Sequence, residues 1–98
     1  MQRYRFRGNL YLWEARVDSW VFVDLPEDLA DEIEDLQHGP RRGFGAVKVE
    51  VTVGATTWRT SIFPSKERAT FVMPVRSAVV KAEGLELGEE VHVEISLI

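Results

Sequence analysis

The chain has 98 residues and a formal net charge of −4, with 45% hydrophobic and 29% charged residues. This length allows one domain with one modest core, and the composition is that of a folded globular protein. The absence of cysteine excludes disulfides, thiolate catalysis, iron–sulfur clusters and thiolate zinc sites. No apolar run approaches the ~20 residues that span a bilayer, and the basic residues 1–7 lead into no signal-peptide core. We therefore expect a cytoplasmic protein.

Basic and acidic residues are segregated along the chain. Residues 1–16 carry a net charge of +3, residues 18–35 carry −8, residues 36–82 carry +6 and residues 83–98 carry −5. Either each block is a solvated face, or the third forms a basic central surface with acidic flanks. The negative total argues against a generic nucleic-acid binder, since such domains are usually basic.

Two strands are predicted before the first helix. Residues 3–13 alternate between apolar and polar side chains, as a half-buried strand does, and Gly8 in the middle indicates a bulge or a bend. Residues 20–25 are apolar on both faces except for Asp24, which is typical of a central strand.

A helix is predicted over about residues 26–38. Pro26 suits the first helical turn, while Leu29, Ile33 and Leu36 form one apolar stripe. Gly39 and Pro40 end the helix. The opposite face is almost wholly acidic, and its residues are Glu27, Asp28, Asp31, Glu32, Glu34 and Asp35.

The remaining elements include the clearest strand of the chain. Valines alternate with polar residues over 47–53, Gly54 and Ala55 form an expected tight turn, and residues 57–63 return as the hairpin partner. A short strand over 70–73 is expected to end at Pro74. A short helix follows over about residues 75–83, capped by Gly84, and residues 91–97 form the last strand.

These elements predict a mainly-β domain over residues 1–98 with six strands and two helices. A small closed or partly open six-stranded β-barrel would hide the valine-rich strand edges from solvent.

The sequence contains no recognisable catalytic or metal-binding motif. His38 falls at the end of the expected helix and His92 on the outward face of the last strand, and no nucleophilic serine motif accompanies them. Two histidines without cysteine do not supply the ligands of a zinc site, and residues 43–45 lack the rest of a phosphate-binding loop. We expect no metal and no cofactor. An enzyme with an unfamiliar site would require Lys66 or Lys81 to be buried beside a pocket.

One group of residues is a candidate ligand-binding site. Glycines before the valine strand would let backbone N–H groups approach a ligand, Arg42 and Arg59 would donate paired hydrogen bonds to a carboxylate or phosphate, and Phe44 and Trp58 would form flat apolar walls. Alternatively, the two rings belong to the core and the arginines to the surface. The candidate residues are Arg41, Arg42, Gly43, Phe44, Gly45, Trp58, Arg59, Thr60, Ser61, Lys66 and Lys81.

These residues indicate a non-enzymatic binding module. Its partner would be a small anionic ligand or an acidic protein surface, held by the basic hairpin that contains glycine, tryptophan and arginine. The alternative is nucleic-acid binding by the same basic face, which would weaken steeply with salt. The sequence leaves the oligomeric state open.

Five short strings along the chain resemble the DUF1905 family, a bacterial family of domains of unknown function. The resemblance implies a small β-barrel with a helix crossing between strands, and it supplies no catalytic residue and no ligand. The strings are Trp20-Val21-Phe22-Val23-Asp24-Leu25-Pro26, Arg42-Gly43-Phe44-Gly45, Trp58-Arg59-Thr60-Ser61-Ile62-Phe63-Pro64, Val80-Lys81-Ala82-Glu83-Gly84 and Gly88-Glu89-Glu90-Val91.

A second likeness covers the last third of the chain. Residues 75–93 are similar to the helix–glycine–strand unit of swapped-hairpin transcription factors of the antitoxin and transition-state-regulator type, with Glu89 in place of the usual aspartate. This analogy supports the alternative function, a nucleic-acid-binding or regulatory domain.

Overall fold

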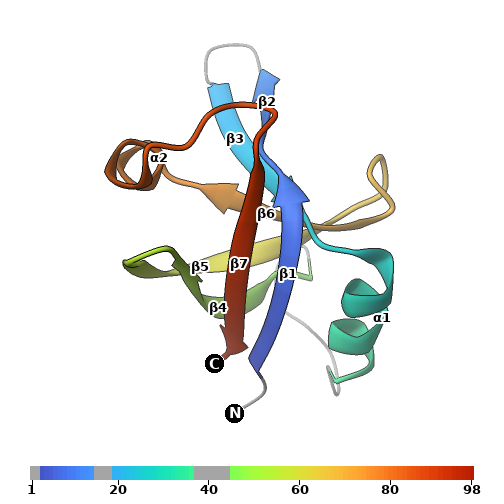
Figure 1. The fold of residues 1–98 in the computed structure, drawn as a ribbon. Helices are drawn as coiled ribbons and strands as arrows, with labels where there is room; N and C mark the ends of the chain where they lie inside the picture. The colour runs from blue at the N-terminus through green and yellow to red at the C-terminus, as the bar shows by residue number, and fades with distance from the viewer. Residues whose placement is uncertain (1–2, 15–18, 37–44) are drawn as a thin grey trace.

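The computed structural model describes residues 3–14, 19–36 and 45–98. Within them, seven strands form one antiparallel sheet in the order β1-β7-β4-β5-β6-β3-β2, and two helices lie at its opposite ends (Figure 1). The elements are β1 (Arg3–Asn9), β2 (Tyr11–Glu14), β3 (Ser19–Asp24), α1 (Glu27–Asp35), β4 (Val47–Val53), β5 (Thr56–Ser65), β6 (Thr70–Val75), α2 (Ser77–Glu83) and β7 (Glu90–Leu97).

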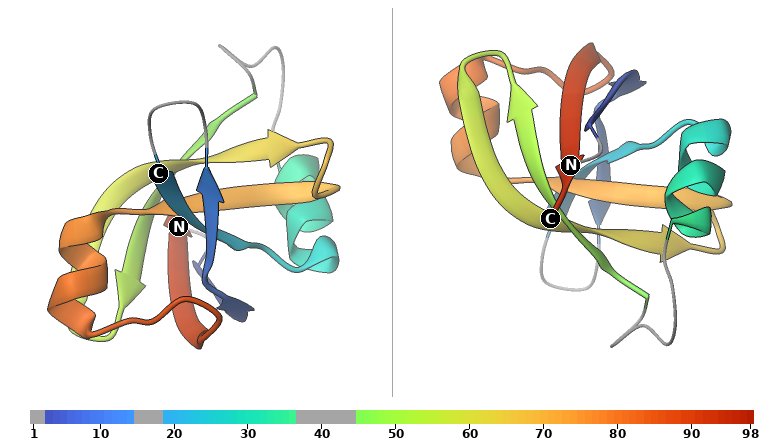
Figure 2. Two further views of the ribbon diagram at one scale, coloured as in Figure 1. Left: turned by 90° about the horizontal axis from the view of Figure 1, so that it is seen from above. Right: turned by 90° about the horizontal axis from the view of Figure 1, so that it is seen from below.

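The sheet curls strongly around its core (Figure 2). The predicted mainly-β fold with two helices is confirmed, but the closed six-stranded barrel is wrong, because seven strands form a curled half-barrel. The extra strand arises because the predicted strand over 3–13 divides at Leu10. The buried Leu10 donates its N–H to Glu89 O at 3.0 Å and accepts from Gly88 N at 2.7 Å. The chain then leaves β7 and pairs with β3, so the two edge strands β1 and β2 are consecutive in sequence.

Gly8 makes the curl possible without a bulge. It pairs with Val91 in an unbroken β1–β7 ladder. A Cβ atom at Gly8 would lie 2.5 Å from Val23 Cγ1 and 3.1 Å from Asp24 O. Only a residue without a side chain therefore allows β1 to lie directly against β3.

The core lies on the inner side of the curled sheet. Alternate residues of every long strand point there, and the valines of β4 are all buried. Ala30 and Ile33 of α1 and Val79 of α2 close its ends. No polar or charged residue is buried among those that the structure describes. Burial of apolar surface therefore provides the main stabilisation.

The β4–β5 hairpin forms as predicted. Val53 pairs with Thr56, so Gly54 and Ala55 are a two-residue turn, and Gly54 has the positive φ of 58° that such turns require. Thr56 Oγ1 donates to Glu83 Oε2 at 2.6 Å, which attaches the end of α2 to this hairpin.

The boundaries of β6, α2 and α1 differ from the sequence prediction. β6 runs through Pro74 instead of ending there, because Pro74 pairs only with Phe22 on one side and β5 no longer flanks it; a proline is tolerated where no ladder bond is needed. Consequently α2 begins at Ser77 rather than near residue 75, and it ends before Gly84 as predicted. Helix α1 spans Glu27–Asp35, and residues 37–38 of the predicted helix lie outside the described residues. Neither described helix is long and apolar enough to cross a membrane.

Candidate functional site

The predicted ligand site is only partly covered by the structure. Arg41, Arg42, Gly43 and Phe44 lie outside the described residues, and Gly45 is half-buried just before β4. The contribution of these arginines to anion binding therefore stays a prediction.

Trp58 and Arg59 lie on opposite faces of β5. Trp58 pairs with the buried Val51 and packs against the core, whereas Arg59 pairs with Glu50 on the outer face. Arg59 Nε lies 3.5 Å from Glu50 Oε2. The indole nitrogen of Trp58 is buried and has no hydrogen-bond partner within the described part of the chain. One ligand therefore cannot contact both side chains, and Trp58 has the core position of the alternative interpretation.

The other predicted site residues are also dispersed. Thr60 pairs with Val49 toward the core and Ser61 with Lys48 on the outer face. Lys66 follows β5 near α1, whereas Lys81 lies on α2 at the opposite end of the molecule (Figure 1). Both lysines are exposed. The buried lysine that an unfamiliar enzyme site would require is therefore not present at either position.

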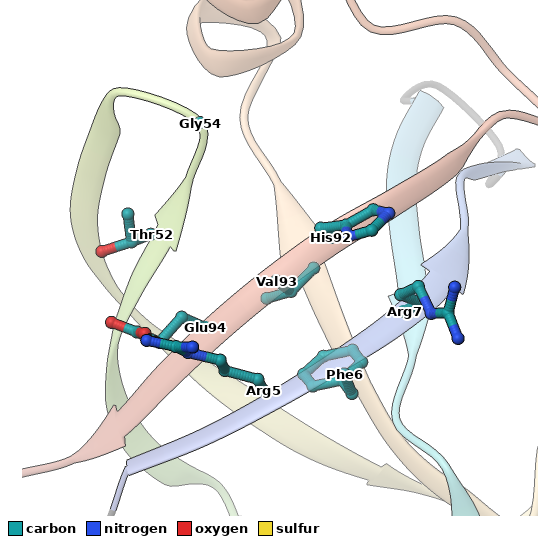
Figure 3. A pocket seen from close by; sticks show the side chains of 8 residues that line it. All are labelled: Arg5, Phe6, Arg7, Thr52, Gly54, His92, Val93 and Glu94. Carbon is teal, nitrogen blue, oxygen red and sulfur yellow. Dashed lines mark hydrogen bonds and ion pairs between the residues drawn. The ribbon is translucent and has the colours of Figure 1, made fainter.

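The outer face of β1, β7 and β4, here called the charged half, carries matched charges (Figure 3). Arg5 Nε lies 2.8 Å from Glu94 Oε1, Arg3 Nε lies 3.8 Å from Glu94 Oε2, and Arg7 Nη1 lies 3.9 Å from Glu90 Oε1. His92 is exposed on this face, as predicted. The half contains a shallow hollow of about 420 Å³. Because the arginines already have glutamate partners, this face has little uncompensated positive charge.

The outer face of β2, β3 and β6 is instead apolar. The register pairs Tyr11 with Phe22 and Trp13 with Trp20. Their neighbours in β3, led by the fully buried Val23, point to the core, so these four rings point outward. Trp13 and Trp20 are 48% and 49% exposed. We call the following residues the aromatic face: Tyr11, Trp13, Trp20, Phe22, Val72 and Pro74.

Phe22 is the centre of the aromatic face. Its ring centroid lies 6.1 Å from that of Tyr11, 6.2 Å from that of Trp13 and 6.4 Å from that of Trp20. The Trp13 contact is edge-to-face and the Trp20 contact is stacked, both favourable geometries for aromatic pairs. The cluster fixes both tryptophans although much of their surface faces solvent.

A polar network borders the aromatic face at the β5–β6 turn. Arg68 contacts Asp24 Oδ2 through Nε and Nη2, each at 2.8 Å, and Tyr11 donates its hydroxyl to Asp24 Oδ1 at 2.6 Å. The guanidinium carbon lies 4.3 Å from the centre of the Tyr11 ring, a cation–π contact. Burial, followed by the bond to Asp24, raises the pKa of Tyr11 above its ordinary value, and the same carboxylate raises the pKa of Arg68.

A hollow of about 320 Å³ lies between this network and the rings. Tyr11, Trp13 and Phe22 line it on the sheet side, and Glu67 and Arg68 line it from the turn. The Arg68 N–H donates to Ser65 Oγ at 3.2 Å, which fixes the turn that carries both charged side chains. A second hollow of about 510 Å³ lies beside Trp20 and Pro74, near Arg76.

Sequence reasoning missed the aromatic face, although a signal was present. Residues 3–13 alternate, yet Tyr11 and Trp13 occupy the positions that arginines occupy earlier in the same stretch. Large aromatic side chains at the outward-pointing positions of a strand indicate that the outer surface there is apolar and not only covered by water.

The described residues supply apolar, aromatic and charged groups at this face. No group of three or more histidine or acidic side chains among them could hold a metal ion. The aromatic face offers flat apolar surface, one cation–π pair and one carboxylate, Glu67, that forms no ion pair with a described residue.

Comparison with known proteins places the chain in a family. No match was found among curated proteins. The family model described as "Domain of unknown function (DUF1905)" matches residues 6–95, nearly the whole length of the fold described above. The chain belongs to the DUF1905 family.

Proposed function

We propose that this domain is a non-enzymatic binding module whose ligand, an extended apolar segment of another protein, contacts the aromatic face. The observation that carries the proposal is the position of Trp13 and Trp20. Both are about half exposed, on the side of the sheet away from the core. Tryptophan, tyrosine and arginine are the residues most enriched among those that dominate binding energy at interfaces.

Two further features of the fold support the proposal: the core is complete without the aromatic face, and the apolar surface of this face is continuous. The core is already complete on the inner side, so half-exposed tryptophans add less to folding than buried ones. The rings continue into Val72 and Pro74 of the neighbouring strand. A continuous apolar surface of this kind is typical of a protein interaction site.

A peptide ligand fits this surface better than a nucleic acid does. Outward rings can stack bases, but stacking modules combine them with a positively charged groove that follows the phosphates. Here Arg68 is neutralised by Asp24, and Glu67 adds a negative charge. At this face, nucleic-acid binding would therefore depend on Arg76 alone among the described cations that line the two hollows.

Peptide selection tests the proposal. Random dodecapeptides displayed on phage are selected against the domain, and the best are measured by calorimetry against wild type, the double variant Trp13→Ala/Trp20→Ala, and Arg59→Ala as a control on β5. We expect the double variant to lose at least about 30-fold in affinity, as two interface hot spots would, and Arg59→Ala to change it less than twofold.

Three outcomes would contradict the proposal. They are failure to select any peptide, equal affinity of wild type and the double variant, and greater sensitivity to Arg59→Ala than to the double variant. The nucleic-acid alternative is tested with a labelled oligodeoxythymidine. Binding that depends on both tryptophans and falls steeply with salt would replace the peptide by single-stranded nucleic acid.

A further inference from the structure

We infer that the hollow between Tyr11, Trp13, Phe22 and Glu67 binds a methylated ammonium group. The inference rests on the proposed function, because this hollow is one end of the aromatic face. The inference adds to the proposed function the chemical class of the ligand group that occupies the hollow.

The walls of the hollow have the electrostatics of a cation site. The faces of aromatic rings carry partial negative charge and attract cations within about 6 Å of the ring centre. Three rings line the hollow, with centroids 6.1 and 6.2 Å from that of Phe22. Arg68 already occupies one such position over Tyr11, at 4.3 Å.

The charge balance favours a positive ligand. Arg68 and Asp24 neutralise each other through two contacts of 2.8 Å. Glu67 then remains as the carboxylate of the hollow without an ion-pair partner among the described residues. An anion would face Glu67 while Arg68, which also lines the hollow, is already paired with Asp24, whereas a cation would gain both the carboxylate and the rings.

The apolar lining selects a methylated cation over a bare ammonium. Val72 and Leu12 complete the wall of the hollow, so a strongly hydrated ammonium would lose its water without full replacement. Methyl groups spread the charge and contact rings and aliphatic side chains directly. Choline-like molecules and a trimethylated lysine side chain share this group.

The test compares choline with 3,3-dimethyl-1-butanol, which has the same shape without the charge, at constant ionic strength. The chain has three tryptophans, so the three indole N–H signals in ¹H–¹⁵N spectra of the full chain report the position of binding. We expect choline to shift the Trp13 signal, to leave that of Trp58 in place, and to bind at least about fivefold tighter than the alcohol.

Variants of the domain distinguish recognition of the ligand's charge from recognition of its shape. Glu67→Gln should weaken choline binding at least about threefold and leave the alcohol unchanged, whereas Trp13→Ala should abolish both. Trp20→Ala is the matched control, since Trp20 does not line this hollow, and it should retain choline binding. A peptide with a single trimethyllysine, compared with its unmethylated form, distinguishes a protein-borne group from a free one.

Equal binding of choline and the alcohol would overturn the inference while leaving the proposed function intact, because the aromatic face would then recognise apolar shape alone. Absence of any choline-dependent shift would also overturn it. A failure of the proposed function would be seen separately, as selected peptides that bind wild type and Trp13→Ala/Trp20→Ala with equal affinity.

Discussion

The two halves of the outer face are built from the same sheet but differ in chemistry. On the charged half, arginines of β1 are matched across the strands by glutamates of β7. On the aromatic face, rings pack against one another around Phe22, and the ion pair lies at the border. Exposed ion pairs contribute little to stability, whereas ring packing and a partly buried charged network contribute more. The aromatic face is thus expected to contribute more to stability than the charged half, whose charges protect the edge strand β1 from pairing with another chain.

The largest effect is expected from Phe22→Ala, which removes the ring that contacts Tyr11, Trp13 and Trp20. The free energy of unfolding should fall by about 3 kcal/mol, since packing and three aromatic pairs are lost. Urea denaturation followed by circular dichroism measures it. A loss below about 1 kcal/mol would mean that the rings are not packed as described.

Asp24→Ala should lower the free energy of unfolding by about 2 kcal/mol, because Arg68 loses its carboxylate partner and the Tyr11 hydroxyl loses its hydrogen-bond acceptor. The same denaturation experiment measures this change. Asp24→Asn is the matched control, since it keeps the shape and one acceptor, and it should cost less. Equal losses in both variants would assign the effect to the charge alone.

Tyr11→Phe should lower the free energy of unfolding by about 1 kcal/mol near neutral pH, because one hydrogen bond is lost. It should also change how the free energy of unfolding depends on pH in the alkaline range. The folded state raises the pKa of Tyr11 above 10.0, through burial and then the bond to Asp24. Above about pH 10 the unfolded chain releases this proton while the folded chain keeps it, so stability falls as pH rises. The variant should show a shallower fall between pH 9 and 11 in urea titrations. An unchanged slope would contradict this assignment.

The smallest effect is expected on the charged half. Glu94→Gln removes the partner of Arg5 and Arg3, yet these side chains are exposed, so the loss should be about 0.5 kcal/mol and should vanish in high salt. Thermal unfolding at low and high sodium chloride measures it. A loss as large as that of Asp24→Ala would erase the distinction between the two halves.

The local elements of this fold were accessible from the sequence, and the seventh strand was not. The β4–β5 hairpin follows from alternating valines around Gly54, a short-range pattern. The division at Leu10 depends on contacts with Gly88 and Glu89, nearly eighty residues away, which periodicity cannot reveal. Likewise Gly8 was predicted to mark a bulge or a bend; the ladder has no bulge there, and the missing side chain makes room for Val23.

The described residues of the predicted site do not converge, for a related reason. Arg59 and Trp58 are neighbours in sequence, and strand geometry places such neighbours on opposite faces. The residues that do converge come from β2, β3 and the β5–β6 turn, and only the sheet order brings them together. Composition and local sequence patterns offered no means of pairing Tyr11 with Arg68.

The pairing of β1 with β7 also determines when the protein can fold. Arg3 is opposite Ser96 and Asn9 is opposite Glu90, so β1 cannot complete its pairing during synthesis before β7 has been made. Such distant pairings slow folding, because a long loop must close before they form. During synthesis the arginine-rich β1 therefore remains without its partner until β7 has been made, and its charges disfavour pairing with other chains in the meantime.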